Sequence, residues 1–431
     1  MGHSQSCQAD PESSVGGLQR PLSGQKRTAC RYCHSTDLVR FLSLGQQPPA
    51  NSFIRAEDLA VERFYPLDVY WCRGCSLVQL VDVVPAELIF NEYVYLSSSS
   101  KALTAHYARL ADMLTKRFAR AGDVVVDIGC NDGILLRGYP RSLTVIGVEP
   151  SKAGALAEAE GFQVITAFFG AQTAHQIIQR HGRAKIVTAT NVFAHVDDIG
   201  RFVEGIRMLL ADDGVFVIEA PYLLDLIDQT LFDTIYHEHL CYLSLTPLVP
   251  FLARYDLEVF DVERVPFGAS GPAIRLLIHA KGAGHPVGLS VQRLLTEEAA
   301  WGVGRLERYL GYAQQVEAIK SKLLALIHHL RDQGRRIGGY SAPAKGNTLL
   351  NYFGFTPALM ECIAETNPLK QHLLTPGAHI PVVSEEEFLA QMPDYAVLLS
   401  WNYLEHFLQH SEYVKRGGRF IVPLPVPSIA P

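Results

Sequence analysis

The sequence lacks several features, and each absence argues against a class of protein. No apolar run reaches the roughly 18 residues that a membrane-spanning helix needs, and no apolar targeting segment is found near the N-terminus. The formal net charge of −6 argues against a nucleic-acid-binding surface. Eight cysteines in a chain of 431 residues do not make a disulfide scaffold. We therefore expect a soluble, cytoplasmic protein with no membrane and no nucleic-acid partner.

The composition that remains is that of a globular chain with several domains. Hydrophobic residues make up 48% of the sequence and charged residues 19%. Apolar strand-like runs alternate with helical patterns, which predicts the α/β class with doubly wound sheets. Residues 1–26 are rich in Ser, Gly, Gln and Pro, and they are expected to form a disordered tail.

Two C-x-x-C pairs follow this tail, and together they offer four thiolates: Cys30, Cys33, Cys72 and Cys75. Four thiolates suit the tetrahedral coordination of Zn²⁺ in a closed structural site. His34 is a competing ligand, and ordinary thiols or a redox-active pair are the alternatives. With four protein ligands the metal has no open position, so we expect it to take no part in the chemistry.

A strand–turn–strand pattern predicts a nucleoside site. The β-branched run at 124–128 is typical of a buried parallel strand, and a second such run, 143–148, ends at the carboxylate of Glu149. An acidic residue at that place suits the ribose hydroxyls of a cofactor. The turn between the strands holds four residues expected at the cofactor: Asp127, Gly129, Asn131 and Gly133. This D-x-G-x-N-x-G turn differs from G-x-G-x-x-G and resembles the first motif of S-adenosylmethionine (SAM) dependent methyltransferases.

The α/β alternation continues beyond this unit, with strands expected at 162–166, 185–190 and 214–221. Phe168 follows the first of these strands, where an adenine ring could stack. Asn191 and His195 follow the second, at the edge of the sheet where ligands bind. A helix is expected at 101–118, over the edge of the cofactor.

Tyr236-His-Glu-His239 is the stretch that bears most on the chemistry. It is not H-E-x-x-H, which disfavours zinc hydrolase chemistry. A histidine that is oriented by a carboxylate and lies beside a phenol is what deprotonation of a carbon acid needs. A polar segment with hydrogen-bonded histidines is the alternative.

The last third of the chain predicts a second α/β unit. After a helix at 305–330, a strand at 336–340 leads into the turn 341–348, and further strands are expected at 360–364, 396–400 and 420–423. Lys345 and the helix that starts beside it would suit a phosphate. A domain for dimerisation or packing is the alternative.

The ordered set of motifs resembles the C-methyltransferases that act on nucleotide-linked 4-keto-6-deoxyhexoses. The resemblance covers about residues 28–425. It rests on the paired cysteines and on the segments 127–133, 191–195, 236–239, 342–348 and 375–381. It implies a small zinc-binding domain (27–88), a central Rossmann-like SAM domain (89–285) and a helical linker with a C-terminal Rossmann-like sugar-nucleotide domain (286–431).

The resemblance also implies roles for particular residues. His239 is the expected general base, with Tyr236, Glu238 and His195 lining the reacting sugar. The residues expected to contact the substrate are Tyr95, Arg275, Lys345 and Asn347. The substrate is expected to be a thymidine diphosphate (TDP) 4-keto-6-deoxy sugar methylated at C3, in deoxysugar and antibiotic biosynthesis. The family's glycine-glycine-serine before an arginine is here Gly268-Ala-Ser-Gly-Pro-Ala-Ile-Arg275, which puts the contacts of this loop in question.

Several alternatives stay open from the sequence. Methylation at C5 is one, and a SAM-dependent O- or N-methyltransferase of another small molecule is a second. A non-catalytic, zinc-containing binding protein is a third. The sequence is compatible with a monomer and with a homodimer.

Overall fold

The computed structural model describes residues 24–90, 96–266, 268 and 271–430. Tyr95 and residues 1–23 of the expected tail lie outside the described residues. The strand β1 (Gln25–Lys26) pairs with β5 (Asp82–Val83), so the described chain joins a sheet from residue 25 onward.

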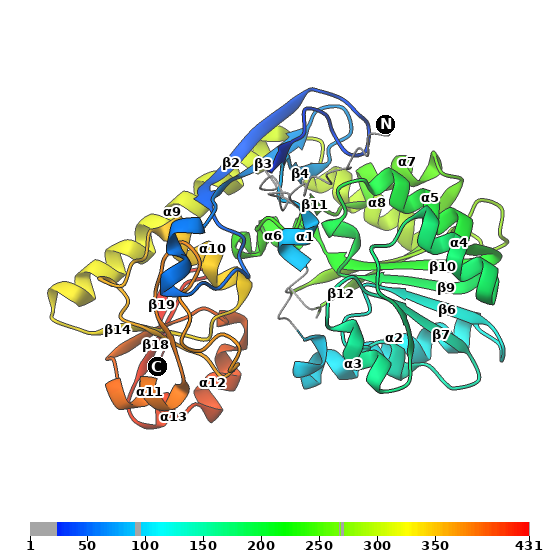
Figure 1. The fold of residues 1–431 in the computed structure, drawn as a ribbon. Coiled ribbons are helices and arrows are strands. Elements are labelled where there is room, and N and C mark those ends of the chain that lie inside the picture. Colours follow the sequence, from blue (N-terminus) through cyan, green and yellow to red (C-terminus); the bar gives the residue numbers. More distant parts are fainter. Residues whose placement is uncertain (1–23, 91–95, 267, 269–270, 431) are drawn as a thin grey trace, which may run out of the picture.

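The N-terminal lobe contains an antiparallel sheet in the order β11-β4-β3-β2. Its strands from the start of the chain are blue in Figure 1. Three of its strands are local: β2 (Leu38–Gln47), β3 (Tyr65–Cys72) and β4 (Val78–Leu80). The fourth, β11 (Cys241–Tyr242), comes directly after the Tyr236–His239 motif and pairs with β4. The N-terminal lobe is therefore joined by backbone hydrogen bonds to the segment expected to be catalytic.

The central lobe is a seven-stranded sheet in the order β12-β13-β10-β9-β6-β7-β8. Its strands are β6 (Val124–Ile128), β7 (Thr144–Val148), β8 (Gln163–Ile165), β9 (Ala184–Thr190), β10 (Leu210–Pro221), β12 (Leu257–Val265) and β13 (Ala273–Ala280). The strands β8, β7, β6, β9 and β10 run parallel, whereas β13 is antiparallel to both β10 and β12. Every residue of β6 is buried, because helices cover both faces of this central strand.

Successive side chains of β6 pack into different cores. Val125 joins a cluster with the helix α2 (Lys101–Phe118), whereas Val126 joins a cluster with the helices α4 (Ala171–His181) and α5 (Ile199–Leu209). Figure 1 shows these helices on opposite sides of the sheet. The helices of this part are α1 (Ala86–Phe90), α2 (Lys101–Phe118), α3 (Gly154–Ala159), α4 (Ala171–His181), α5 (Ile199–Leu209), α6 (Leu223–Asp228) and α7 (Leu245–Ala253). Short 3₁₀ turns include η4 (Phe193–His195) and η5 (Phe232–Thr234).

Two helices, α8 (Leu289–Trp301) and α9 (Leu306–Asp332), lead to the C-terminal lobe, and α9 lies along the outside of the molecule in Figure 1. The sheet of this lobe has the order β16-β15-β14-β17-β18-β19, with only β19 antiparallel. Its strands are β14 (Ile337–Tyr340), β15 (Ile363–Ala364), β16 (Val382–Val383), β17 (Tyr395–Leu398), β18 (Arg419–Val422) and β19 (Ser428–Ile429). Its helices are α10 (Ala344–Phe353), α11 (Glu385–Gln391), α12 (Leu404–His410) and α13 (Glu412–Lys415). This is the Rossmann strand order 3-2-1-4-5-6.

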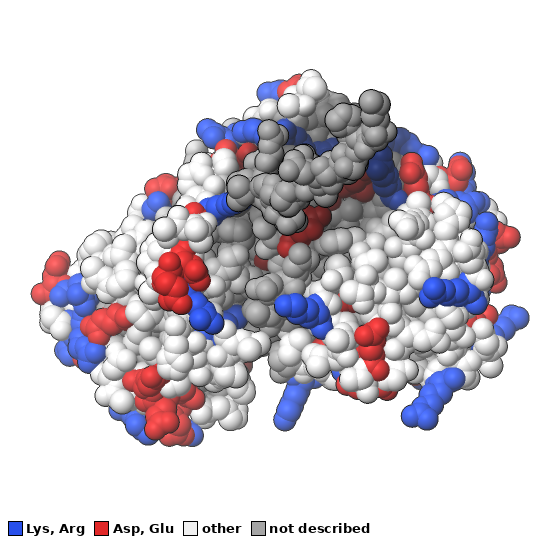
Figure 2. Space-filling view, viewed as in Figure 1, with Lys and Arg blue, Asp and Glu red and all other residues white. Residues whose placement is uncertain are grey.

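The predicted fold class, a small N-terminal domain followed by two Rossmann-like α/β domains, is confirmed. On the face shown in Figure 2, charged side chains of both signs are interspersed over the described parts of the central and C-terminal lobes. None of the helices in the described part of the chain combines the length and the apolar character needed to cross a membrane.

Candidate active site and zinc centre

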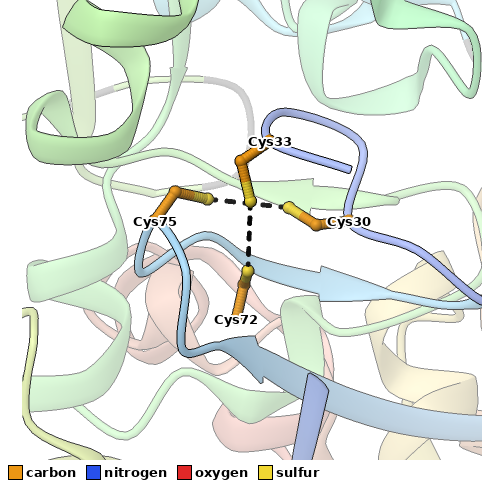
Figure 3. A group of neighbouring side chains, drawn as sticks. All are labelled: Cys30, Cys33, Cys72 and Cys75. Atoms are coloured by element: carbon orange, nitrogen blue, oxygen red, sulfur yellow. Dashed lines mark hydrogen bonds between the residues drawn. The ribbon is translucent and has the colours of Figure 1, made fainter. Parts of the chain in front are cut away.

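The four cysteines converge on one point, as Figure 3 shows. The Sγ atoms of Cys30 and Cys75 are 3.6 Å apart, those of Cys33 and Cys72 are 3.5 Å apart, and all four lie within 4.8 Å of one another. A tetrahedron with Zn–S bonds of about 2.3 Å has sulfur–sulfur distances of about 3.8 Å. The four thiols therefore fit a zinc ion.

Two tight backbone turns present these thiols. His34 and Ser76, which follow the two C-x-x-C pairs, have φ values of 61° and 70°. A Cβ atom at Gly74 would approach the Cys33 Sγ to 3.2 Å, so this position favours glycine. His34 is exposed, and the metal-binding group contains only the four cysteines among the described residues. The competing His34 ligand is therefore not supported.

The turn after β6 has the conformation expected of a close approach to a ligand. Gly129 and Asn131 have φ values of 69° and 50°, and a Cβ at Gly129 would lie 2.3 Å from Val192. Gly133 also has a positive φ, but a Cβ there would meet Ala157 at 2.9 Å. Gly129 and Asn131 line a large cavity, whereas Gly133 packs against α3 and does not line it.

Glu149 closes this turn from the end of β7. Its Oε2 accepts from the Asn131 backbone N–H, and its Oε1 accepts from the Ser151 N–H, both at 2.9 Å. The carboxylate is buried and lines the cavity, and each oxygen has a second lone pair. Glu149 can therefore hold the turn and still accept from two ribose hydroxyls.

Three more residues predicted at the cofactor line the same cavity. Asp127 accepts from the Thr188 hydroxyl at 2.6 Å, and burial raises the pKa of Asp127 to about 7. Asn191, with a φ of 55°, donates from Nδ2 to the Tyr107 hydroxyl at 2.8 Å. Phe168 is 46% exposed at the cavity, which leaves ring surface available for stacking.

His239 is buried at the wall of this cavity, and its ring has a defined tautomer. Its Nδ1 lies 2.6 Å from the carbonyl oxygen of Thr234 in η5. A carbonyl only accepts, so Nδ1 carries the proton and donates, which leaves a lone pair on Nε2. Burial lowers the pKa of His239 to about 4, so the imidazole is neutral at pH 7, the state that a base needs.

Two rings that line the cavity contact His239. The Tyr236 ring centroid lies 4.1 Å from that of His239, and the His195 ring meets it edge-on at 4.9 Å. Burial and the neighbouring His239 lower the pKa of His195 well below its usual value. Tyr236, His195 and His239 thus form one cluster, with two polar groups beside the candidate base.

The C-terminal lobe closes the other side of the cavity with the start of α10. Lys345 lines it, and its Nζ donates to Asn402 Oδ1 at 2.6 Å and lies 3.6 Å from Asp233 Oδ2. Beside it, Glu365 at the end of β15 accepts from the backbone N–H of Ala342 at 2.8 Å. The cavity has a volume of about 990 Å³, enough for two ligands of nucleoside size.

Besides Gly133, three of the predicted site residues in the described part of the chain lie away from the cavity. Arg275, in β13, donates to the carboxylates of Glu219 and Glu263 at 2.8 and 2.9 Å, so its guanidinium is used within the sheet. Asn347 is buried and donates to the Ala50 carbonyl at 2.7 Å, which ties α10 to the N-terminal lobe. Glu238 is 2% exposed and accepts from Asn51 at 2.7 Å.

Two charged residues on the C-terminal wall were not among the site residues predicted from the sequence. Glu365 and Lys370 both line the cavity, and Lys370 donates to the Ala342 carbonyl at 2.8 Å. Burial lowers the pKa of Lys370, although the carboxylates of Glu365 and Glu238 act in the opposite direction. The sequence did contain a signal for Glu365. It is an acidic residue at the end of the second strand of its α/β unit, the same position that Glu149 has in the central domain.

Comparison with known proteins first gives the class. The model described as "Putative zinc binding domain" matches residues 30–90, "Methyltransferase domain" matches 103–262, and "C-methyltransferase C-terminal domain" matches 269–425. The chain is therefore a SAM-dependent methyltransferase with a structural zinc ion, which the four thiols and the turn at Glu149 both fit.

The family follows from one curated relative. The C-methyltransferase NovU of Streptomyces niveus is 34% identical over 405 residues, which are 93% of this chain and 96% of that protein. The chain belongs to this family of C-methyltransferases, as its motifs indicated, and it is an enzyme.

Solved methyltransferase structures resemble part of the chain. A SAM-dependent methyltransferase from Clostridium acetobutylicum is 13% identical and covers 43% of this chain and 94% of its own, with a TM-score of 0.33. The CcbJ methyltransferase from Streptomyces caelestis is 15% identical and covers 41% and 90%, with a TM-score of 0.32.

Proposed function

We propose that this enzyme methylates the carbon next to the keto group of a nucleoside-diphosphate-linked 4-keto-6-deoxy sugar. The position is C3, the nucleotide is TDP, and the product enters deoxysugar and antibiotic biosynthesis. The observation that carries the proposal is the place of His239. This neutral histidine, with a lone pair on Nε2, lines one cavity together with the turn at Glu149 and the start of α10.

The two ends of the cavity support different ligands. The residues that we assign to SAM on the central wall are Asp127, Gly129, Asn131, Glu149, Phe168 and Asn191. When bound, SAM supplies an electrophilic methyl group. Lys345 and the N-terminus of α10 suit the diphosphate of the sugar nucleotide, and the carboxylate of Glu365 suits a hydroxyl of its nucleoside.

The chain's own residues supply the proton chemistry between these ends. The ketone acidifies the hydrogen on the neighbouring carbon, and His239 removes this proton through Nε2. The donated bond from Nδ1 to the Thr234 carbonyl keeps the ring oriented and stabilises the imidazolium that forms. Tyr236 or His195 donates a hydrogen bond to the developing enolate oxygen. The carbon nucleophile is then aligned for methylation by the walls that hold the two ligands.

The proposal also accounts for the remaining polar groups of the motif. Glu238 precedes His239 in the chain, is buried outside the cavity and accepts from Asn51, so we assign it a supporting role rather than contact with the sugar. A reduced-thiol zinc site and a nucleotide-linked substrate both suit the cytoplasm.

A panel of acceptors tests the proposal. Purified enzyme with SAM should methylate a TDP-4-keto-6-deoxy sugar at carbon, and it should leave the corresponding 4-hydroxy sugar nucleotide unmodified. NMR of the product distinguishes C3 from C5. Methylation of the 4-hydroxy compound, or transfer to oxygen or nitrogen, would contradict the carbon-acid mechanism and favour an O- or N-methyltransferase.

A further inference from the structure

A loop of the N-terminal lobe crosses to the C-terminal lobe directly after β2. The side chain of Asn347 in α10 donates to the Ala50 carbonyl at 2.7 Å. Four residues later, Ile54 forms a two-bond bridge with Leu374, with N–O distances of 3.0 and 2.8 Å. The loop is therefore fixed at two points on the C-terminal lobe.

Asn51 lies between these two points, and it lines the cavity. Its Nδ2 donates to the Oε1 of Glu238 at 2.7 Å, across 187 residues of sequence. A carboxylate only accepts, so the Nδ2 end of the amide must face Glu238. Glu238 is 2% exposed and lies between His237 and His239 in the chain.

The residues that follow His239 in the chain are bound to the sheet of the zinc-binding lobe. The backbone N–H of Leu80 donates to the Leu240 carbonyl at 3.0 Å, and β11 pairs with β4. Arg31, in the first cysteine turn, forms an ion pair at 3.0 Å with Asp197, two residues beyond His195. The N-terminal lobe thus contacts both segments that bring histidines to the cavity.

We propose that Asn51 is a positioning residue of the active site, through which the zinc-binding lobe fixes the carboxylate of Glu238 and with it the orientation of His239. The zinc ion then supports the reaction without touching it, because it stabilises the lobe that carries this loop. The inference rests on the proposed function only for its rate measurement.

The groups around this hydrogen bond define what a charge change would do. Lys370 of the C-terminal lobe faces Glu238, and Glu365 lies beside that lysine. The ring of Phe53, from the Asn51 loop, lies 4.9 Å from the Lys370 Nζ. His237 and His239 are the titratable neighbours of Glu238 in its own segment. Lys370 therefore faces Glu238, and a second carboxylate beside Glu238 would add a like charge at a buried position.

Asn51→Asp is the most informative variant. It puts a second carboxyl group within hydrogen-bond distance of Glu238, and two such groups share one proton because they cannot both ionise cheaply. At low pH the shared proton replaces the amide N–H, and at high pH the two charges repel. Relative to wild type, kcat should fall about tenfold or more between pH 6 and pH 8.5, and Tm should fall by at least about 2 °C over the same range.

The double variant Asn51→Asp/Glu238→Gln inverts donor and acceptor. It leaves one carboxylate and restores a hydrogen bond, so the additional loss of Tm at high pH should disappear. Asn51→Ala should lower kcat at least about tenfold while the SAM Kd stays within twofold. Ser52→Ala, on the next and exposed residue of the loop, should match wild type in every measurement.

The outcomes separate this inference from the proposed function. A wild-type enzyme that turns over none of the 4-keto sugar nucleotides contradicts the proposed function, while the pH dependence of Tm in Asn51→Asp still reports on the hydrogen bond. A Tm that follows wild type at every pH overturns the inference. An Asn51→Ala variant with kcat within twofold of wild type overturns it as well.

Discussion

The two turns that line the cavity share one arrangement of backbone hydrogen bonds, but the side chains around them differ in charge. After β6, the carboxylate of Glu149 accepts from the backbone N–H groups of Asn131 and Ser151, both at 2.9 Å. After β14, the carboxylate of Glu365 accepts from those of Ala342 and Asn367, at 2.8 and 2.9 Å. In both units an acidic residue at the end of the second strand closes the turn that follows the first.

The difference between the turns lies in what surrounds each carboxylate. At the Glu149 turn the carboxyl group of Asp127 also lines the cavity, whereas Lys345 and Lys370 line the wall around Glu365. A turn with carboxylates suits a cofactor that carries a positive sulfonium, and a turn with two lysines suits a diphosphate. The same backbone arrangement can therefore bind two different nucleoside ligands, and the charges of the neighbouring side chains determine which ligand it binds.

Loss of the zinc ion should have the largest effect. The loop that contacts α10 and Glu238 comes from the zinc-bearing lobe, so Cys30→Ser or Cys75→Ser should disturb the lysine-lined turn more than the Glu149 turn. Because structural zinc sites contribute about 10 kcal/mol or more, we expect reduced solubility and a Tm lowered by about 10 °C or more. Metal analysis by mass spectrometry checks this, with Cys362→Ser, outside the cluster, as the control. Less than about half an equivalent of zinc in fresh wild-type protein would contradict the site.

Replacing each of the two carboxylates by alanine should weaken the binding of a different ligand. Glu149→Ala should weaken SAM binding by about 1.5–3 kcal/mol, the range for a lost hydrogen bond to a charged group, and leave nucleotide binding unchanged. Glu365→Ala should weaken nucleoside diphosphate binding and leave SAM binding unchanged. Calorimetry with each ligand measures both. If either variant weakened both ligands equally, the assignment of one nucleoside to each turn would be wrong.

The motif between the turns should make stability sensitive to acid. Burial lowers the pKa of both His237 and His239 to about 4. Their unfolded pKa is about 6.5, so the unfolded state takes up protons first, and stability is lost as pH falls from about 6.5 toward 4. Each histidine should cost about 2 kcal/mol between pH 7 and pH 5. Urea unfolding of His237→Gln should show a weaker pH dependence than wild type, and an unchanged slope would count against burial of the neutral ring.

Removing a single cation should have the smallest effect. Lys345→Met should weaken TDP binding about tenfold, equivalent to about 1.4 kcal/mol, and leave binding of uncharged thymidine nearly unchanged. Lys320→Met is the control, because Lys320 lies over the Tyr352 ring outside the cavity. Equal loss for TDP and thymidine would mean that Lys345 does not contact the diphosphate.

Local patterns in the sequence predicted most of the elements that carry the site. The helix expected at 101–118 is α2, with the same bounds, because a serine cap and a 3.6-residue period both lie within the segment. The strand expected at 124–128 is β6, and the four cysteines converge as their spacing indicated. These features depend on neighbours in sequence.

Contacts between distant segments could not be read in the same way. Arg275 was expected at the substrate, but its guanidinium pairs with Glu219 across a strand pair that has no short-range signal. Asn51 was overlooked, since its partner Glu238 is 187 residues away. Asn347 lies in the predicted turn at 341–348, yet its side chain contacts the N-terminal lobe because α10 packs against β2 and the loop that follows it.

Hydrogen exchange at the methylated carbon tests the central claim, that His239 is the base between the two turns. In D₂O, with a non-reactive SAM analogue, wild-type enzyme should incorporate deuterium into the 4-keto sugar nucleotide beside the ketone, above the uncatalysed rate. His239→Gln should bind both ligands but lose exchange and methyl transfer together, by about 10² to 10⁴. Exchange and turnover both within a few-fold of wild type would contradict the account, and His195 would become the next candidate.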